Sequence, residues 1–381
     1  MIVGGSYQVL QYSPVRVVYG PGSLRELGIL AKSQGAKRVL LVTDPGLKAA
    51  GHAGLAVRLL AEAGLSVAIF DGVRENPTTA HVAEGVKLAA LSGADFMVGL
   101  GGGSAMDCAK GINLILTNGG MVADYWGINK ANKPHLPMIL IPTTSGTGSE
   151  AQSFALISDA ATHQKMACGD RRLPVDGGLR PRVAILDPEL TRSAPRSVAA
   201  AAGIDAVAHA IETAGSRAQT PQSLECSQQA WALLEPALPR ALLNPDDQLA
   251  HAHMLLGAHL AGIAIELSML GAAHACANPL TARCGITHGI AVGLMLPHVI
   301  RFNAASGANP YASICHSANE LADRVEELQF AASLPRHLSA CGVTGEQLPV
   351  LAAEAAQQWT AGFNPRPVDA DSLLHLYRAA W

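Results

Sequence analysis

Asp205 and His209 stand four residues apart in the alanine-rich stretch "GIDAVAHAIE" (203–212), and both side chains are of types that bind metal ions. On a helix this spacing puts two side chains on one face, with about 5–6 Å between their Cβ atoms. A carboxylate and an imidazole at that separation either satisfy each other inside a helical core or form half of a metal site. The pair alone leaves both interpretations open.

Two further histidines could complete such a site. His274 lies in "GAAHACANPL" and His288 in "GITHGIAVGLMLPHV". One carboxylate and three imidazoles suit a divalent ion such as Fe²⁺ or Zn²⁺, with room for a substrate oxygen. The spacing does not show that these four residues converge, since other histidines of the same half are equally eligible by type. They are His251, His253, His259, His298 and His316, and we expect most of them to be satisfied in the core or solvated.

A glycine-rich stretch, "VGLGGGSAMDCAKG" (98–111), runs from a strand-like segment into a helical one. Gly101, Gly102 and Gly103 let the backbone approach a ligand closely, and Ser104 is a natural helix N-cap. The helix start offers free N–H groups and the positive end of the helix dipole, which suits a phosphate. The spacing differs from the usual dinucleotide-binding pattern, so a tight structural turn is the alternative.

Asp44 ends the strand-like segment "VLLVTD" (39–44), where a carboxylate can accept hydrogen bonds from both ribose hydroxyls of a nucleotide. Its charge would repel a 2′-phosphate, which favours NAD over NADP. The alternative is a turn-forming Asp before Pro45 and Gly46. A third polar loop, "PTTSGTGSE" (142–150), follows another strand-like segment. Three such loops at successive strand ends indicate one crevice of the kind in which open α/β sheets bind ligands.

The elements that would position these residues change in type along the chain. Uninterrupted apolar runs, as in parallel strands buried on both faces, alternate with amphipathic helical segments in the first half; they cover 39–44, 67–70, 96–101 and 138–143. From about residue 191 onward the pattern is helical, with almost no strand-like run. We therefore predict a dinucleotide-binding α/β domain over 1–190, with an open parallel sheet, and an all-α metal-binding domain over 191–381.

The composition excludes several classes of protein. The 381 residues are 49% hydrophobic and 15% charged with a net charge of −3, which gives no argument for a nucleic-acid or membrane-surface partner. Seven scattered cysteines without a CxxC motif are typical of reduced thiols. The first residues lack the features of a signal peptide, and the most apolar helical stretch is interrupted by histidines and a glutamate. We expect a cytoplasmic protein that does not enter a membrane.

The sequence resembles the iron-containing, or group III, alcohol dehydrogenase family, in order and over almost the whole chain. The matching segments are "YGPGSLRELG", "VTDPGL", "NPTT", "GLGGGSAMDCAKG", "IPTTSGTGSE", "AILDPEL", "GIDAVAHAIE", "LPHVIRFN" and "NPRPV". The resemblance implies the dehydroquinate synthase-like fold of that family, with a Rossmann-like first domain and a helical second domain. It also implies a homo-oligomer, a dimer or larger.

The resemblance implies which residues hold the two cofactors. The ligands of Fe²⁺, or of Zn²⁺ in its place, would be Asp205, His209, His274 and His288. The contacts to NAD would come from Asp44, Asn76, Gly102, Gly103, Ser104, Ala105, Met106, Asp107, Thr143, Thr144, Thr147 and Lys165. Lys165 would be the cationic group near the nicotinamide ribose, and a solvated surface lysine is its alternative.

The implied activity is reversible hydride transfer between a small alcohol and NAD, which gives an aldehyde or a ketone. One alternative is a dehydroquinate synthase-like lyase that uses NAD and a metal. Such an enzyme needs basic residues for phosphate-bearing substrates, whereas the segments around the expected ligands are rich in Ala, Gly, Ile and Leu. The other alternative is a non-catalytic NAD-binding member of the family.

Two positions depart from the family's pattern. Asn278 stands four residues after His274, where many relatives carry another histidine. Asparagine does not titrate near neutral pH, so a proton relay that depends on that histidine is in doubt. Phe154 stands where relatives often have a polar residue beside the nicotinamide, which predicts an altered pocket wall.

Overall fold

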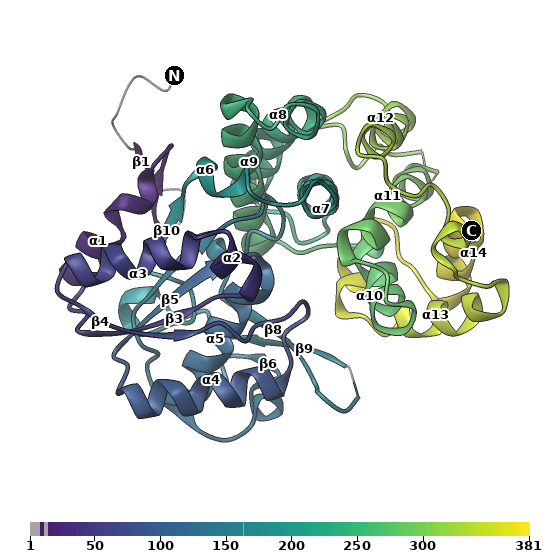
Figure 1. Ribbon diagram of the computed structural model, residues 1–381. Helices are drawn as coiled ribbons and strands as arrows, with labels where there is room; N and C mark the ends of the chain where they lie inside the picture. Colours follow the sequence, from purple (N-terminus) through teal and green to yellow (C-terminus); the bar gives the residue numbers. More distant parts are fainter. Residues whose placement is uncertain (1–7, 11–13, 163, 306) are drawn as a thin grey trace. The chain divides into compact units, whose positions relative to one another are not determined.

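The computed structural model describes residues 8–10, 14–162, 164–305 and 307–381. The chain forms two compact units. The first runs to Thr144 and resumes over Gly148–Ala194, and the second comprises Ser145–Thr147 and Pro195–Trp381. The first unit contains the strands together with helices, and the second is built from helices (Figure 1).

The first unit is built on a seven-stranded sheet of order β1-β2-β10-β7-β5-β3-β4, in which only the edge pair of β1 and β2 is antiparallel among the described residues. The strands are β1 (Gln8–Leu10), β2 (Arg16–Tyr19), β3 (Arg38–Val42), β4 (Ser66–Phe70), β5 (Phe96–Gly101), β7 (Met138–Pro142) and β10 (Val183–Leu186). The expected open parallel sheet is confirmed. The four strand-like runs of the sequence correspond to β3, β4, β5 and β7.

Helices cover both faces of this sheet (Figure 1). Successive residues of β3 alternate between two cores. Leu40 and Val42 pack with α4 (Thr79–Ser92) and α5 (Gly103–Asn118). Val39 and Leu41 pack with α1 (Leu27–Ser33) and α3 (His52–Glu62). Burial on both faces explains why the strands are continuous apolar runs. The helices of the unit are η1 (Ser23–Glu26), α1 (Leu27–Ser33), α2 (Pro45–Ala49), α3 (His52–Glu62), α4 (Thr79–Ser92), α5 (Gly103–Asn118), η2 (Val122–Tyr125), η3 (Ser149–Ala151), η4 (Pro174–Asp176) and α6 (Pro188–Thr191).

A second sheet in this unit was not expected from the sequence. It has three strands in the order β6-β9-β8: β6 (Gly127–Ile128), β8 (Phe154–Ser158) and β9 (Lys165–Gly169). Strands β8 and β9 pair antiparallel, with Phe154 opposite Gly169 and Ser158 opposite Lys165. This hairpin therefore carries two of the positions that the sequence singled out.

The described part of the second unit is helical, as expected. Its helices are α7 (Arg196–Gly215), α8 (Pro221–Leu243), α9 (Gln248–Leu267), α10 (Ala272–Cys284), α11 (His288–Ala304), α12 (Ala318–Ala331), η5 (Leu338–Cys341), η6 (Gly345–Gln347), α13 (Leu348–Ala355), η7 (Trp359–Phe363) and α14 (Ala370–Ala380). Helix α7 packs against α8, α9 and α11, and every residue from Gly203 to Gly215 is buried. A helix buried on all sides has small or apolar side chains all round, which explains the alanine-rich sequence of α7.

Within the described residues, no single helix is long and apolar enough to cross a membrane. Only α9 and α10 taken together pass by length and composition, and that pair is bent by 104°.

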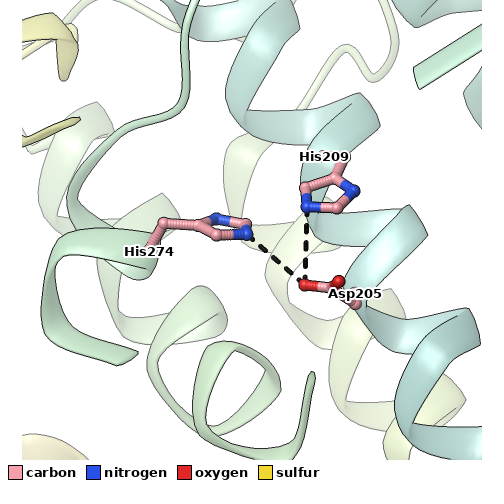
Figure 2. A group of neighbouring side chains, drawn as sticks. All are labelled: Asp205, His209 and His274. Carbon is pink, nitrogen blue, oxygen red and sulfur yellow. Dashed lines mark ion pairs between the residues drawn. The ribbon is translucent and has the colours of Figure 1, made fainter. Parts of the chain in front are cut away.

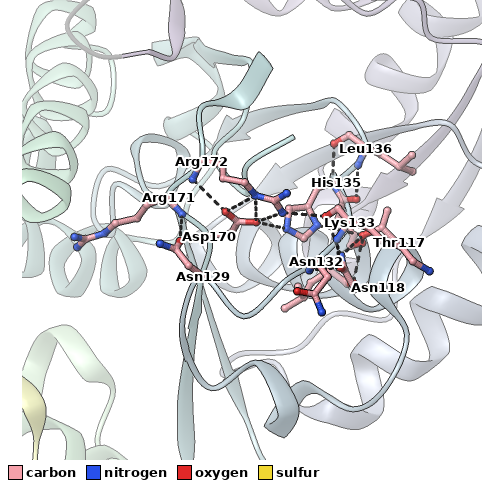
Figure 3. A network of polar contacts seen from close by, with 12 residues as sticks. Thr117, Asn118, Asn129, Asn132, Lys133, His135, Leu136, Asp170, Arg171 and Arg172 are labelled. Carbon is pink, nitrogen blue, oxygen red and sulfur yellow. Dashed lines mark hydrogen bonds and ion pairs between the residues drawn. The ribbon is translucent and has the colours of Figure 1, made fainter. Parts of the chain in front are cut away.

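A buried polar network ties the β8–β9 hairpin to the end of α5 (Figure 3). His135 is 6% exposed; its Nε2 lies 3.1 Å from Asp170 Oδ2 and its Nδ1 lies 3.2 Å from Thr117 Oγ1. Arg172 Nε donates to both oxygens of Asp170, at 3.1 and 3.0 Å. Burial lowers the pKa of His135 more than the neighbouring Asp170 raises it. Burial by itself would raise the pKa of Asp170, but the hydrogen bonds from Arg172 outweigh this effect and lower the pKa of the carboxyl.

Both pKa shifts make the first unit sensitive to acid. A histidine whose pKa is lowered by folding takes up its proton first in the unfolded state, so stability falls as the pH drops below the ordinary value of 6.5. A carboxyl with a lowered pKa adds stability above its ordinary value of 3.8, and this is lost as the pH falls through the folded pKa. The variant His135→Gln should therefore be less stable than the natural protein at pH 7.5, by about 1–3 kcal/mol for a disrupted buried hydrogen-bond pair. The deficit should shrink toward pH 5.

Scanning calorimetry at a series of pH values measures this deficit as the difference in Tm. His316→Gln, at an exposed position, is the control and should give no deficit at either pH. A deficit of His135→Gln that stays constant from pH 7.5 to 5 would contradict the lowered pKa of His135.

Candidate metal centre and nucleotide-binding loops

Helix α7 carries Asp205 and His209 in its middle, one turn apart. Both are 4% exposed, so each side chain faces the interior of the helical unit. A buried carboxylate costs several kcal/mol unless positive charge or hydrogen-bond donors surround it. The neighbours of this pair therefore decide what it does.

Two neighbouring helices begin at this point. His274 is the third residue of α10 and His288 is the first residue of α11. Gly289 permits the approach of α11 to α7, since a Cβ on Gly289 would lie 2.0 Å from the carbonyl oxygen of Ala201. A residue with a side chain at this position would push the start of α11, and His288 with it, away from Asp205.

The four predicted ligands converge on one oxygen atom. Asp205 Oδ1 lies 3.4 Å from His274 Nε2, 3.5 Å from His209 Nε2 and 3.9 Å from His288 Nε2. Figure 2 shows the rings of His209 and His274 turning their nitrogens toward this carboxylate. Their ring centroids are 4.8 Å apart, and those of His274 and His288 are 5.4 Å apart. The ligand atoms of Asp205, His209 and His274 all lie within 4.8 Å of one another.

The pKa shifts in this cluster follow from burial and from the neighbouring charges. Burial by itself would raise the pKa of Asp205, but the histidines, His209 first, hold it well below its usual range. Burial lowers the pKa of His209 more than Asp205 raises it. For His274 burial is opposed by Glu212 and Asp205, which together raise its pKa to about 9.

These residues fit a divalent metal ion. Among the described residues, neither Asp205 Oδ1 nor His274 Nε2 has a hydrogen-bond partner of ordinary geometry, and both atoms are buried. Buried polar atoms are rarely left unsatisfied, so the cluster is suited to an ion that all of its ligand atoms can share. One carboxylate with three imidazoles suits ferrous iron and zinc alike.

The other histidines of this unit are not part of the cluster. His251 and His259 lie in α9 and are buried, and His253 in the same helix is half-buried. Within the described residues, the only three or more metal-binding side chains whose ligand atoms all lie within 4.8 Å of one another are Asp205, His209 and His274. The convergence that spacing alone left open is thus a property of the structure.

In the first unit, the glycine-rich segment forms the turn from β5 into α5. Gly101 has φ +154°, and a Cβ there would lie 2.6 Å from the Cβ of Ala105 and 3.4 Å from Asp44 Oδ2. Gly102 is the N-cap of α5, and Gly103 is its first residue. Ser104 is therefore not the N-cap that the sequence suggested; its Oγ accepts a hydrogen bond of 3.3 Å from the backbone N–H of Asn76.

Other predicted nucleotide contacts gather around this turn. Asp44 is the N-cap of α2, and its Oδ1 accepts from the N–H of Leu47 at 3.1 Å. Thr143 donates its N–H to the carbonyl of Gly101 at 3.0 Å, and a Cβ on Gly102 would lie 3.4 Å from Thr144 Oγ1. The structure thus brings Asp44, Asn76, Thr143 and Thr144 to the carboxyl ends of β3, β5 and β7, where open α/β sheets bind ligands.

Three residues of the predicted loop point into the protein. Ala105 and Met106 are 1% exposed, and their N–H groups donate to the carbonyl of Gly102 at 3.1 and 3.2 Å. Asp107 Oδ1 accepts a hydrogen bond of 2.6 Å from Ser149 Oγ. Burial raises the pKa of Asp107, with the ammonium group of Lys110 opposing it. The buried side chains of these residues anchor the loop to the interior of the first unit.

Lys110, which the sequence analysis did not single out, supports the same region. It is fully buried, and its Nζ donates to Ser149 O at 2.7 Å, Ser149 Oγ at 2.8 Å and Phe154 O at 2.7 Å. It thereby fixes the start of β8 on α5. A sequence offers little to distinguish a buried lysine of this kind from a surface one.

Two further predicted contacts lie elsewhere. Lys165 begins β9 and is half-buried, with its charge close enough to lower the pKa of Asp107 slightly, as the smallest of several causes. Thr147 belongs to the second unit together with Ser145 and Gly146.

The two departures from the family's pattern also have defined surroundings. Asn278 Nδ2 donates to Oε1 of Gln358, the residue before η7, at 3.0 Å, and this hydrogen bond holds the side chain. The ring of Phe154 is buried on β8, and the guanidinium carbon of Arg171 lies 5.5 Å from its centroid. Both positions are packed into their own units.

The sequence analysis also missed Glu212. It lies seven residues after Asp205 on α7 and contacts His274, and it is part of the stretch "GIDAVAHAIE". Positions i, i+4 and i+7 share one face of a helix, and this spacing could have identified it.

Comparison with known proteins identifies the class. The model of the iron-containing alcohol dehydrogenase family matches residues 14–188, and that of the C-terminal region of the Fe-containing alcohol dehydrogenase family matches residues 199–381. The chain is 36% identical to alcohol dehydrogenase 4 of Schizosaccharomyces pombe, over 97% of this chain and 88% of that protein. It is 34% identical to the NAD-dependent methanol dehydrogenase of Bacillus methanolicus, over 97% and 99%. A crystal structure of 1,3-propanediol oxidoreductase aligns with a TM-score of 0.91 at 30% identity, over 99% of each chain.

The fold and the site thus define a two-unit, metal-dependent oxidoreductase. The chain belongs to the iron-containing alcohol dehydrogenase family. The family, fold class and alcohol–aldehyde oxidoreductase activity predicted from the sequence are confirmed. Its cofactors are iron and NAD, in agreement with the family, with the NAD-dependent relative and with the cluster around Asp205.

The geometry predicts that all of the converging nitrogens are needed to hold the metal. Changes to residues that only support a metal ligand typically weaken metal binding about 10–100-fold. Replacing His288 by Ala should weaken it more than that. NAD binding should be unchanged, because His288 belongs to the helical unit and not to the strand ends of the first. The measurements are metal content per chain by elemental analysis and NAD affinity by calorimetry. His253→Ala on the same unit is the control, and normal metal content in His288→Ala would remove it from the ligand set.

Proposed function

We propose that this protein interconverts a small alcohol and its aldehyde or ketone by hydride transfer with NAD, and that Asp205, His209, His274 and His288 hold the iron. The convergence of three imidazole nitrogens on the buried oxygen of Asp205 carries the proposal. When bound, the iron supplies a Lewis acid for the substrate oxygen, and NAD supplies the hydride acceptor.

The protein's own residues bind and orient. Asp205 contributes the negative charge of the ligand set, and the histidines contribute neutral nitrogens from three different helices. Of these four side chains, three are almost fully buried, and only that of His288 is partly exposed, at 26%. We infer that substrate reaches the iron from the side of His288.

For NAD we propose the contacts predicted from the sequence, most of which lie at the strand ends of the first unit. The set comprises Asp44, Asn76, Gly102, Gly103, Ser104, Ala105, Met106, Asp107, Thr143, Thr144, Thr147 and Lys165. Gly102 and Gly103 stand at the start of α5, where the helix dipole favours a phosphate. The side chains of Ala105, Met106 and Asp107 are buried, so we assign these three a supporting role and leave direct contact to their neighbours.

The boundaries 1–190 for the dinucleotide-binding domain and 191–381 for the metal-binding domain stay a prediction. We also propose a cytoplasmic protein, because all seven cysteines are free thiols, as expected in a reducing compartment. The family resemblance alone supports a homo-oligomer of two or more chains. Relatives named for methanol and 1,3-propanediol support a small alcohol or diol as the substrate.

The proposed activity is tested with anaerobically purified protein. Metal-dependent NADH formation should occur with members of a panel of small primary alcohols and diols, and added Fe²⁺ or Zn²⁺ should restore it after chelation. The rate of NADH formation and the metal content are measured in the same preparation, with His288→Ala as the control. Stoichiometric metal without NADH formation across the panel would instead favour a lyase-type or non-catalytic role.

The preference for NAD over NADP is predicted to depend on the charge of Asp44. Asp44→Asn keeps a good N-cap for α2 but removes the charge that would repel a 2′-phosphate. The ratio of kcat/KM for NAD to that for NADP should fall about tenfold, which corresponds to about 1.4 kcal/mol.

Asp44→Ala separates the two roles, since it removes the cap as well as the charge. It should show the same loss of cofactor preference together with a loss of stability of about 1 kcal/mol. An unchanged ratio in both variants would mean that another group distinguishes the two nucleotides.

A further inference from the structure

Glu212 is a buried carboxylate next to the metal centre that is not one of the four ligands. It follows Asp205 by seven residues and His209 by three on α7, and it is 4% exposed. A buried carboxylate of this kind must be paired or hydrogen-bonded to be tolerated. Its partners therefore define its role.

Both oxygens of Glu212 are used at the start of α10. Glu212 Oε2 makes a short hydrogen bond with His274 Nδ1. Glu212 Oε1 accepts a hydrogen bond of 2.8 Å from the backbone N–H of Ala273. The carboxylate is thus held by two donors from adjacent residues, one of which belongs to the ring that faces Asp205.

The first of these hydrogen bonds decides which nitrogen carries the proton when the ring is neutral, as a metal ligand must be. A neutral imidazole carries one N–H and one lone pair. When Nδ1 donates its proton to Glu212, the lone pair is on Nε2, the nitrogen that lies 3.4 Å from Asp205 Oδ1. We propose that Glu212 is a positioning residue of the metal centre, which holds His274 in the tautomer and orientation that present Nε2 to the iron.

This inference rests on the proposed function, in which His274 is a ligand. A carboxylate behind a metal-bound histidine fixes the ring and makes the ligand more basic. Glu212 comes from the helix that also carries Asp205 and His209. One helix therefore supplies two ligands and orients a third.

A glutamine cannot take over both hydrogen bonds. Its single carbonyl oxygen can accept from His274 Nδ1 or from the N–H of Ala273, but not from both. If the amide NH₂ faces Ala273, two donors meet. If it faces His274, Nδ1 must accept and the proton moves to Nε2, which can then no longer bind a metal.

The test compares metal affinity in matched variants. Apo-protein is titrated with Zn²⁺ against a chromogenic chelator, and the absorption spectrum of the Co²⁺-loaded protein is recorded. Glu212→Gln should bind Zn²⁺ about 10–100-fold more weakly and should change the Co²⁺ spectrum. Wild-type affinity together with an unchanged spectrum would overturn the proposal.

Asn364→Ala controls for a merely structural role at the same helix start. Asn364 Oδ1 accepts from the N–H of Ala272 at 3.2 Å, next to the bond that Glu212 makes. The other hydrogen bonds of its side chain within the described residues join it to Asn303 and Arg366 rather than to His274. This variant should lose stability but keep Zn²⁺ affinity and the Co²⁺ spectrum. A loss of affinity as large as that of Glu212→Gln would show that loosening of α10 is sufficient, and would overturn the positioning role.

A measurement on the natural sequence covers the case in which Glu212→Gln does not fold. Nitrogen NMR of the histidine-labelled, Zn²⁺-loaded protein reports the state of each ring nitrogen, and His274→Ala assigns the signals. His274 should show a protonated Nδ1 and a metal-bound Nε2. The reverse pattern would overturn the proposal.

Asp205→Asn in the same Zn²⁺ titration separates this inference from the proposed function. If Asp205→Asn keeps full affinity, the proposed metal site itself fails. If Asp205→Asn loses affinity while Glu212→Gln retains it, only the role of Glu212 fails.

Discussion

The second unit depends on the electrostatics of one buried carboxylate. Asp205 lies in the middle of a buried helix, and an isolated charge in such a place costs several kcal/mol. Three imidazole nitrogens within 3.4–3.9 Å of its Oδ1 offset that cost. To bring them there, α10 and α11 must both begin beside α7, and this demands a residue without a side chain at Gly289. The packing of α10 and α11 against α7 is therefore set by the need to place the imidazoles around Asp205.

The first unit meets a different requirement with different means. A parallel sheet buried on both faces places the ends of β3, β5 and β7 at one edge, and each end continues into a polar loop. The backbone at Gly101 and Gly102 and the start of α5 need small residues on the ligand side, whereas Met106 and Lys110 anchor the same helix from the inner side. A loop that buried side chains anchor and that has glycines at the helix start suits a ligand whose phosphates are bound mainly by backbone groups.

Much of this could be predicted from the sequence, and the remainder has physical reasons. Runs such as "VLLVTD" identify buried parallel strands because both faces must be apolar, and the i, i+4 spacing of Asp205 and His209 fixes their common face. The β8–β9 hairpin was missed because "FALIS" and "KMACG" are short. That His274 joins the cluster while His259 does not depends on where α10 begins relative to α7, which no local pattern encodes. The resemblance to a family supplied that long-range information.

The charges on α7 explain why the cluster is suited to a divalent ion rather than to a self-contained network. Asp205 and Glu212 bring two carboxylates into a buried region, and both face His274, one at each of its nitrogens. Without a metal, the nearest available counter-charge is a proton on this ring, which agrees with the rise of its pKa to about 9. A second proton on the same cluster is opposed, because burial lowers the pKa of His209. A divalent ion held by Asp205, His209, His274 and His288 would supply positive charge to both carboxylates, and it would take the place of a proton on His274 Nε2. The residue that makes His274 a better ligand therefore also makes the proton a stronger competitor for it.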